Sequence, residues 1–143
     1  MPDNIPTTAD ATLNRAYEEA MEMLIDARDF AKEQREASSD LESDQRLRLS
    51  QYTMQVTARL TQIMAWLMAN KAVATGELPP ETLADDTYAL PETGSIAGED
   101  AEWLEKEQAD RDIIPDRLSN LMDRSRALYQ RISRLDQQAR KAG

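Results

Sequence analysis

The sequence predicts an all-α protein: a three-helix up-down-up bundle that forms one domain over residues 1–143 and is expected to be dimeric. The composition favours helices, because only four glycines and one phenylalanine occur among many Ala, Leu, Glu, Arg and Gln residues. Three long stretches also repeat apolar residues at alternating steps of three and four, the spacing of a packed helix face. Residues that commonly begin or end helices flank these stretches.

The first helix is predicted over residues 10–36, with Thr8 or Asp10 as its N-cap residue. The stretch ASSDLES (37–43) ends it, because Ser and Asp side chains compete for backbone hydrogen bonds. Such a short connection is typical of antiparallel neighbours. The apolar face of this helix consists of Leu13, Tyr17, Ala20, Leu24, Ala27 and Ala31.

The second helix is predicted over residues 43–75, with Gly76 as its C′ residue. It contains the run LTQIMAWLMA (60–69), in which eight of ten residues are apolar. A surface helix normally has one apolar face about 100° wide, so this helix is expected to be covered on two sides. The side that packs in the chain's own core consists of Leu49, Tyr52, Val56, Leu60, Ile63, Leu67 and Ala74.

The opposite side of the second helix is predicted to be the interface of a homodimer or of another protein partner. Arg59 and Trp66 flank it seven residues apart, where a guanidinium can contact the indole or bind a partner's carboxylate. Two alternatives stay open: the chain itself encloses the helix, and Trp66 is a core residue rather than an interface anchor. The predicted interface consists of Met54, Ala58, Arg59, Thr61, Ala65, Trp66 and Met68.

The third helix is predicted over residues 115–141, with Pro115 at its first position. Beside its apolar face lie Arg117, Arg124 and Arg131, spaced seven residues apart, which we call the arginine row. These side chains are expected to be solvated or to pair with acids of a neighbouring helix. They are also candidate partner-binding residues.

An acidic segment, residues 77–112, connects the second and third helices. Residues 77–116 carry 13 acids and two bases, whereas residues 117–143 carry two acids and seven bases. We expect the segment to be flexible, since proline and like charges supply little packing. It is also expected to screen the arginine row, although solvation of both charge sets explains the same residues. GEDAEWLEKEQA (98–109) is predicted to form a short helix.

Several function classes are disfavoured by the residue content. The chain has no Cys and no His, which removes the commonest general base and most transition-metal ligand sets. Its net charge of −10 argues against nucleic acid as a partner. A basic, apolar signal peptide is absent from MPDNIPTTAD, and no run is long enough to span a membrane, so a cytoplasmic location is expected.

One carboxylate cluster deserves comparison with a known enzyme class. Glu19, Glu22, Asp26 and Asp29 share a face of the first helix, as the Mg²⁺ ligands of all-α nucleotide pyrophosphohydrolases do. They are expected to face water, and residues 45–76 of the adjacent helix contain no acid that could complete a metal site. We therefore expect no catalytic, cofactor or metal site, and the enzyme stays the unfavoured alternative.

Two stretches resemble the signature sequences of the RcdA family, the regulators of CtrA degradation of alphaproteobacteria. They are VTARLTQIMAWLMANKAVATGE (56–77) and RSRALYQRISRLD (124–136), while RAYEEAMEMLIDARDF (15–30) fits the family's first helix more loosely. The matching residues are Val56, Thr57, Arg59, Leu60, Ala65, Trp66, Leu67, Ala72, Val73, Gly76, Glu77, Leu128, Tyr129, Arg131, Ile132, Leu135 and Asp136.

This resemblance implies a three-helix bundle that is usually dimeric and has no catalytic activity. It further implies an adaptor that helps deliver cell-cycle regulators to the ClpXP protease. The partners would then be ClpX, a response-regulator-type protein and protein substrates. A structural or interaction dimer of the same family, without adaptor activity, is the alternative.

Overall fold

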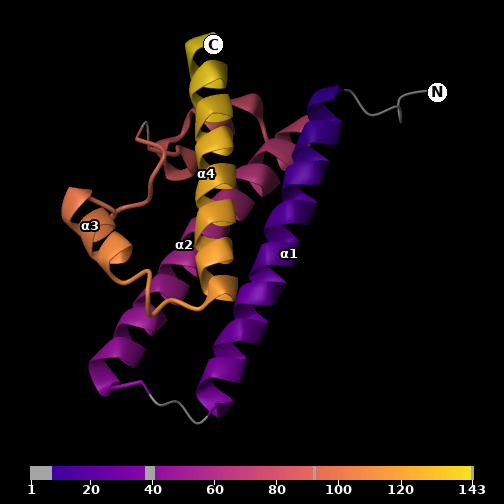
Figure 1. Ribbon diagram of the computed structural model, residues 1–143. Helices are drawn as coiled ribbons and strands as arrows, with labels where there is room; N and C mark the ends of the chain where they lie inside the picture. Colours follow the sequence, from indigo (N-terminus) through magenta and orange to yellow (C-terminus); the bar gives the residue numbers. More distant parts are fainter. Residues whose placement is uncertain (1–7, 38–40, 92, 143) are drawn as a thin grey trace.

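A computed structural model describes residues 8–37, 41–91 and 93–142, which form helices and no strand. The all-α class is therefore as predicted. In the described part of the chain, no helix is long and apolar enough to cross a membrane. The elements are α1 (Thr8–Glu36), α2 (Ser43–Ala74), the 3-10 helices η1 (Pro80–Ala84) and η2 (Asp86–Tyr88), α3 (Ala101–Ala109) and α4 (Asp116–Ala142) (Figure 1).

The ends of the helices follow from local chemistry. Gly76 has φ of +82°, the left-handed conformation that ends α2 and that a glycine adopts without strain. At the start of α3, the Asp100 carboxylate accepts a hydrogen bond from the backbone N–H of Trp103 at 2.8 Å. At the start of α2, the side chain of Gln45 accepts a hydrogen bond from the backbone N–H of Glu42 at 3.1 Å. The three long helices begin and end within two residues of the predicted positions.

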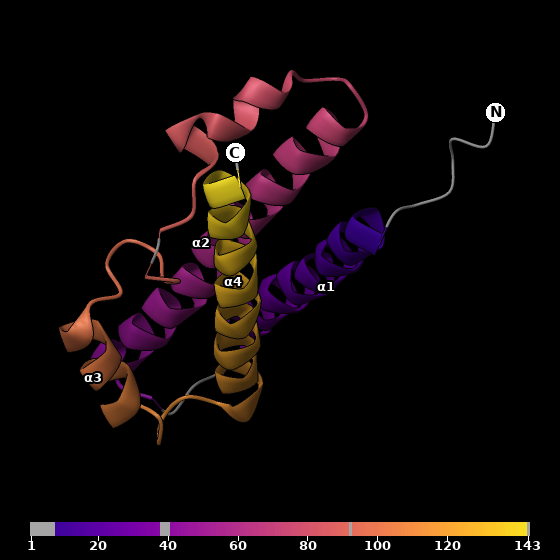
Figure 2. The ribbon, with the colours of Figure 1, turned by 90° about the horizontal axis from the view of Figure 1, so that it is seen from above.

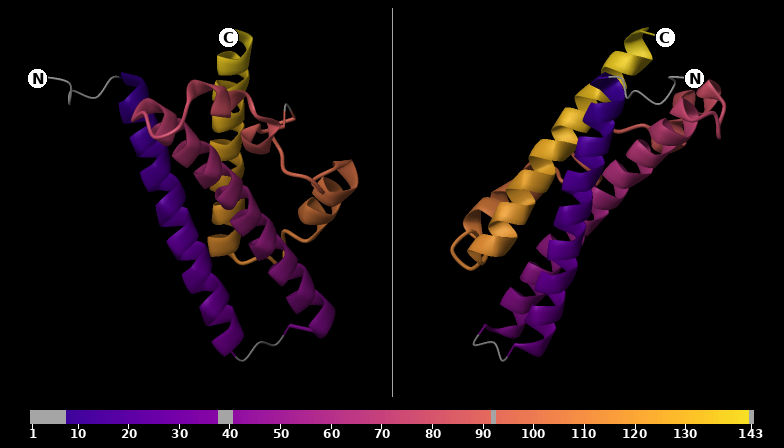
Figure 3. Two further views of the ribbon diagram at one scale, coloured as in Figure 1. Left: turned by 180° about the vertical axis from the view of Figure 1, so that it is seen from behind. Right: turned by 90° about the vertical axis from the view of Figure 1, so that its right-hand side faces the viewer.

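The direction of the last helix differs from the prediction. α1 and α2 are antiparallel, but α4 runs parallel to α2, so the predicted up-down-up order is wrong (Figure 1, Figure 3). The hydrogen bonds between α2 and α4 give the direction, because Arg59 donates to Ser125 and Trp66 donates to Asp136. The physical reason is the connection between them: residues 75–115 are long enough to return the chain along the whole bundle.

The hydrophobic core lies where α1, α2 and α4 meet. α1 contributes Ala16, Ala20, Met23, Ala27 and Phe30, a face shifted from the predicted one. Of the residues predicted there, Leu13, Tyr17 and Leu24 lie half-buried at the edge, because α1 packs against two helices and needs a wide face. The other two helices contribute Leu49, Tyr52, Val56, Leu60, Ile63, Met64, Trp66, Leu67, Leu118, Leu121, Met122, Leu128, Tyr129 and Ile132.

The acidic segment lies along α2 and α4, and α3 lies on the side of the bundle away from α1 (Figure 1, Figure 2). Leu90, Ile96 and Ile114 insert into the core and are 4–6% exposed. Gly94 also packs closely, since a Cβ there would come within 3.1 Å of the Gln130 side chain. The expected flexibility of residues 77–112 stays a prediction, but the segment contributes buried side chains to the bundle.

Candidate functional site

The outward side of α2 is an exposed, largely uncharged stripe. Of the predicted interface residues, Met54 is 69% exposed and Met68 is 58% exposed, and Ala58, Thr61 and Ala65 are exposed between them. Sequence reasoning missed Leu47, which is 61% exposed and lies seven residues before Met54 on the same stripe. We call Leu47, Met54, Ala58, Thr61, Ala65 and Met68 the α2 outer face.

Arg59 and Trp66 do not belong to this face, and their assignment to the interface was wrong. Arg59 is 1% exposed and Trp66 is 5% exposed. Both side chains point toward α4: the Arg59 guanidinium donates to the Ser125 hydroxyl at 2.8 Å, and the Trp66 indole donates to Asp136 at 2.8 Å. The reason is that the flank they occupy faces the parallel neighbour α4 and the acidic segment, rather than solvent.

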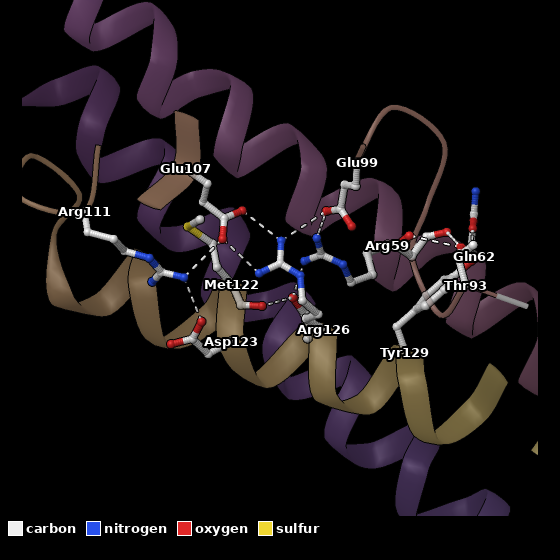
Figure 4. A network of polar contacts seen from close by, with 12 residues as sticks. Arg59, Gln62, Thr93, Glu99, Glu107, Arg111, Met122, Asp123, Arg126 and Tyr129 are labelled. Atoms are coloured by element: carbon white, nitrogen blue, oxygen red, sulfur yellow. Dashed lines mark hydrogen bonds and ion pairs between the residues drawn. The ribbon is translucent and has the colours of Figure 1, made fainter. Parts of the chain in front are cut away.

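A buried ion pair joins Arg59 to Glu99 of the acidic segment (Figure 4). The Glu99 side chain is 0% exposed, and Arg126 of α4 approaches the same carboxylate oxygen, Oε1, at 3.4 Å. Burial lowers the pKa of Arg59 to about 10, and the nearby positive charge of Arg126 adds to this shift. A buried charge is tolerated only when it is paired, so Glu99 is the counter-ion that lets Arg59 lie inside the protein.

The ion pair continues into a chain of alternating charges (Figure 4). Arg126 donates to both carboxylate oxygens of Glu107 on α3, at 2.9 and 2.8 Å. Arg111 then bridges Glu107 at 3.1 Å and Asp123 of α4 at 2.9 Å. We call Arg59, Glu99, Arg126, Glu107, Arg111 and Asp123 the ion-pair chain; it ties the acidic segment to both α2 and α4.

Competing effects set the charge of Glu107. Burial alone would raise the pKa of this carboxyl, but the hydrogen bonds and positive charge of Arg126 oppose it more strongly. The resulting pKa of Glu107 lies below its usual range. Among the atoms of the network, Arg59 Nε, Arg126 Nε and Glu99 Oε2 are buried without a hydrogen-bond partner in the structure. The chain of charges is therefore incompletely satisfied, which makes it sensitive to loss of a member.

Sequence reasoning did not single out Glu99, Glu107 or Arg126. The available signal was Arg59, a charged residue at the edge of an apolar run on a helix that has no acid between residues 45 and 76. Such a residue needs a counter-ion from elsewhere in the fold. Spacing along the chain cannot say which of the 13 acids of residues 77–116 supplies it.

A second set of contacts fixes α3 on α2. The Tyr52 hydroxyl donates to Asp110 at 2.5 Å, and Arg48 lies 3.3 Å from the same carboxylate. Burial and the Asp110 charge raise the pKa of Tyr52 above its ordinary value, so the phenol keeps its proton. The Trp103 ring meets the Tyr52 ring edge-on, with 5.5 Å between centroids.

The arginine row pairs with α1 rather than with the acidic segment, so the expected screening by that segment was wrong. Arg117 contacts Asp26 at 2.9 Å and also pairs with Glu33, and Arg131 contacts Glu19 at 3.0 Å. Glu19, Asp26 and Glu33 also step by seven residues, and α1 is antiparallel to α4, so these acids lie beside the arginine row. In the described part of the chain, Arg124 has no ion-pair partner, and it is exposed.

The carboxylates that were compared with a metal site are used differently. Glu19 and Asp26 bind arginines of α4, and Asp29 pairs with the adjacent Arg28 at 3.1 Å. Over residues 8–37, 41–91 and 93–142, no group of three or more Asp, Glu, His or Cys side chains converges as a metal site would require.

Comparison with known protein families identifies the family of this chain. Residues 6–143 match the family described as a protein of unknown function, DUF1465. The chain belongs to this family. No curated protein matches the DUF1465 chain.

Among solved structures, this DUF1465 protein is similar to RcdA from Caulobacter crescentus CB15, with a TM-score of 0.62 and 28% sequence identity. The similarity covers 88% of this chain and 88% of RcdA. The protein is therefore RcdA-like, as the resemblance of its second and third long helices indicated.

We predict that Arg59 and Glu99 are strongly coupled. Arg59→Met or Glu99→Met alone leaves a buried charge without its main partner and should lower the free energy of unfolding by about 3–5 kcal/mol. The double variant removes both charges and should recover most of that loss. Urea unfolding followed by circular dichroism measures all four proteins of this cycle.

The matched control is Arg28→Met, because the Arg28 side chain is 73% exposed and, among the residues that the structure describes, pairs only with its neighbour in sequence. It should change stability by no more than about 0.5 kcal/mol. Additive losses in the double variant would contradict the coupling. If a single variant does not fold, folding of the double variant still tests it.

We also predict a pH-dependent contribution from Glu107. Its folded pKa is depressed, so its stabilisation is present above the unfolded value of about 4.3 and is lost as pH falls through the folded pKa. Glu107→Gln should therefore be less stable than wild type by about 1–3 kcal/mol at pH 7, and the difference should shrink toward pH 3. Urea unfolding at several pH values between these limits measures it.

Glu102→Gln is the control on the same helix, since the Glu102 side chain is 77% exposed. It should stay within about 0.5 kcal/mol of wild type across the series. A Glu107→Gln deficit that is constant with pH would show that the lost contribution is packing rather than charge.

Proposed function

We propose that this protein is a non-enzymatic, cytoplasmic adaptor or scaffold that helps deliver cell-cycle regulatory substrates to the ClpXP protease. The observation that carries the proposal is the likeness to RcdA, which spans 88% of both chains rather than one shared helix. The signature stretches in α2 and α4 support it, because they lie on the two helices that share the ion-pair chain and form much of the core.

The charge arrangement supports a protein-binding role over a catalytic one. The arginines of the ion-pair chain already hold their carboxylates within the molecule, at 2.8–3.4 Å for Arg126 and Arg111. Because these charged side chains are paired with one another, they stabilise the fold and are not available to bind a substrate. Two surface features that the ion-pair chain leaves open to a partner are the apolar α2 outer face and the exposed Arg124.

The α2 outer face is proposed as the homodimer interface. Leu47, Met54 and Met68 are large apolar side chains that are 58–69% exposed. Ala58, Thr61 and Ala65 between them are small enough for the same helix of a second copy to approach closely. A two-fold dimer is self-complementary, so one such stripe per chain is sufficient.

Ala65→Arg is predicted to convert a dimer into a monomer. A long charged side chain in the middle of a close helix contact would be buried without a partner, which costs several kcal/mol of association energy. Because Ala65 is exposed on the isolated chain, helix content should not change. Sedimentation velocity at micromolar concentration, with circular dichroism, measures both quantities.

Ile25→Arg is the matched control, because Ile25 is an apolar residue of α1 that is 44% exposed and lies outside the α2 outer face. This variant should remain dimeric. A wild-type monomer at micromolar concentration would rule the interface out, as would an Ala65→Arg variant that stays dimeric.

The protease link predicts direct recovery of ClpX and ClpP. Immobilised wild-type protein incubated with a Caulobacter crescentus extract should enrich both over beads without protein, as measured by quantitative mass spectrometry. Arg124→Glu and Arg28→Glu baits carry the same charge change. Comparing them tells whether the arginine row binds a partner or is simply solvated. A lower yield with Arg124→Glu alone would identify the arginine row as a partner-binding site.

The competing function is a structural or interaction dimer of the same family without adaptor activity. It predicts a dimer in sedimentation and no enrichment of ClpX or ClpP from the extract. That pair of results would overturn the adaptor proposal while keeping the dimer.

A further inference from the structure

A groove lies between the N-terminal half of α1 and the C-terminal half of α4. Figure 1 shows that these two half-helices lie at the end of the bundle where α4 ends. Its volume is about 400 Å³, within the range of ligand-binding clefts. The floor is apolar and continuous with the core, since Ala16, Leu128 and Ile132 are buried and Leu135 is half-buried. Residues 128–135 extend over about 10 Å of helix, which is about two turns.

The rim of this groove is basic. Arg15 of α1 and Arg131 and Arg134 of α4 stand around it, against one acid, Glu19. The Glu19 carboxylate is held by Arg131, with 3.0 Å from one guanidinium nitrogen to each oxygen. Within the described ranges, neither Arg15 nor Arg134 has an ion-pair partner. A chain of net charge −10 thus places unpaired guanidinium groups beside an apolar cleft.

We infer that this groove binds an acidic amphipathic helix of a partner protein. The apolar floor takes the helix's apolar side chains, and the arginine forks match carboxylate geometry better than lysine would. A cleft between two antiparallel helices is also the shape into which a third helix packs. Arginine is among the residues that most often dominate binding energy at such interfaces.

Other occupants fit the same features less well. The dense phosphates of nucleic acid or of an anionic membrane need a wide basic surface, whereas the rim of this groove has three arginines around an apolar floor. The acidic segment of a second copy is also less suitable. Its carboxylates at Glu99, Glu107 and Asp110 are already bound by arginine or tyrosine side chains of their own chain.

This inference deepens the proposed function, and its biological meaning rests on the adaptor role, because it names the chemistry of a protein that the adaptor would hold. The groove and the α2 outer face lie on different sides of the bundle, since α2 turns that face away from α1 and α4. A dimer formed through α2 therefore leaves both grooves open.

Fluorescence anisotropy with a synthetic peptide tests the groove without the protease. The probe is a fluorescein-labelled helix-forming peptide of about three turns, with leucines along one face and glutamates elsewhere. Wild-type protein should bind it saturably with a Kd of about 1–100 μM. Combining Arg15→Glu with Arg134→Glu should weaken binding at least about tenfold, with unchanged circular dichroism because both side chains are exposed.

Two sets of controls make the test specific. Arg28→Glu carries the same charge change as each of the two groove substitutions, on another side of α1, and should alter the Kd by less than about twofold. Peptides with serine in place of leucine, or lysine in place of glutamate, should bind at least about tenfold more weakly than the probe.

The inference is overturned by the absence of saturable binding below about 1 mM, or by equal losses in Arg28→Glu and the groove variant. If the serine peptide bound as tightly as the probe, the interaction would be electrostatic only, and the inference would be overturned. Binding to phosphatidylglycerol vesicles but not to the probe would overturn it as well. Failure of peptide binding alongside recovery of ClpX contradicts only the groove, whereas the reverse contradicts only the adaptor role.

Discussion

The buried pair of Arg59 and Glu99 is the constraint on which the rest of the structure depends. Arg59 lies on the side of α2 that faces α4, where a guanidinium is costly unless a carboxylate accompanies it. Neither helix offers one at that position, because α2 has no acid after Asp44 and α4 has only Asp116, Asp123 and Asp136. The counter-ion therefore comes from the connection between them, and that requirement fixes residue 99 in the middle of the bundle.

The parallel arrangement of α2 and α4 allows the connection between them to supply this counter-ion. A connection that runs the length of the bundle passes both helices, and it is held at intervals: Leu90 donates its backbone N–H to Asp136, and Glu107 binds Arg126. Pairing of this kind also relieves the self-repulsion of a segment with 13 acids. The long acidic connection that looks like a linker in the sequence is thereby part of the structure that orients α4.

Ion pairs within the chain engage several of its arginines, which determines what the surface can offer. Arginines of the ion-pair chain are engaged with carboxylates, and two members of the arginine row hold α1 through Asp26 and Glu19. The surface keeps the apolar α2 outer face on one side and the groove rimmed by Arg15 and Arg134 on another. These two chemically different faces of one small domain support the adaptor proposal.

The sequence by itself determined the helices of this protein, because caps such as Gly76 and apolar spacing act within a few residues. It also indicated the exposed side of α2, from Met54 to Met68. Only the tertiary structure decided the direction of α4, since apolar residues at steps of three and four read the same in a parallel or an antiparallel neighbour. It likewise decided that Arg59 and Trp66 are covered by their own chain and that Arg117 binds Asp26, because the partner of a side chain depends on which distant segment the fold brings beside it.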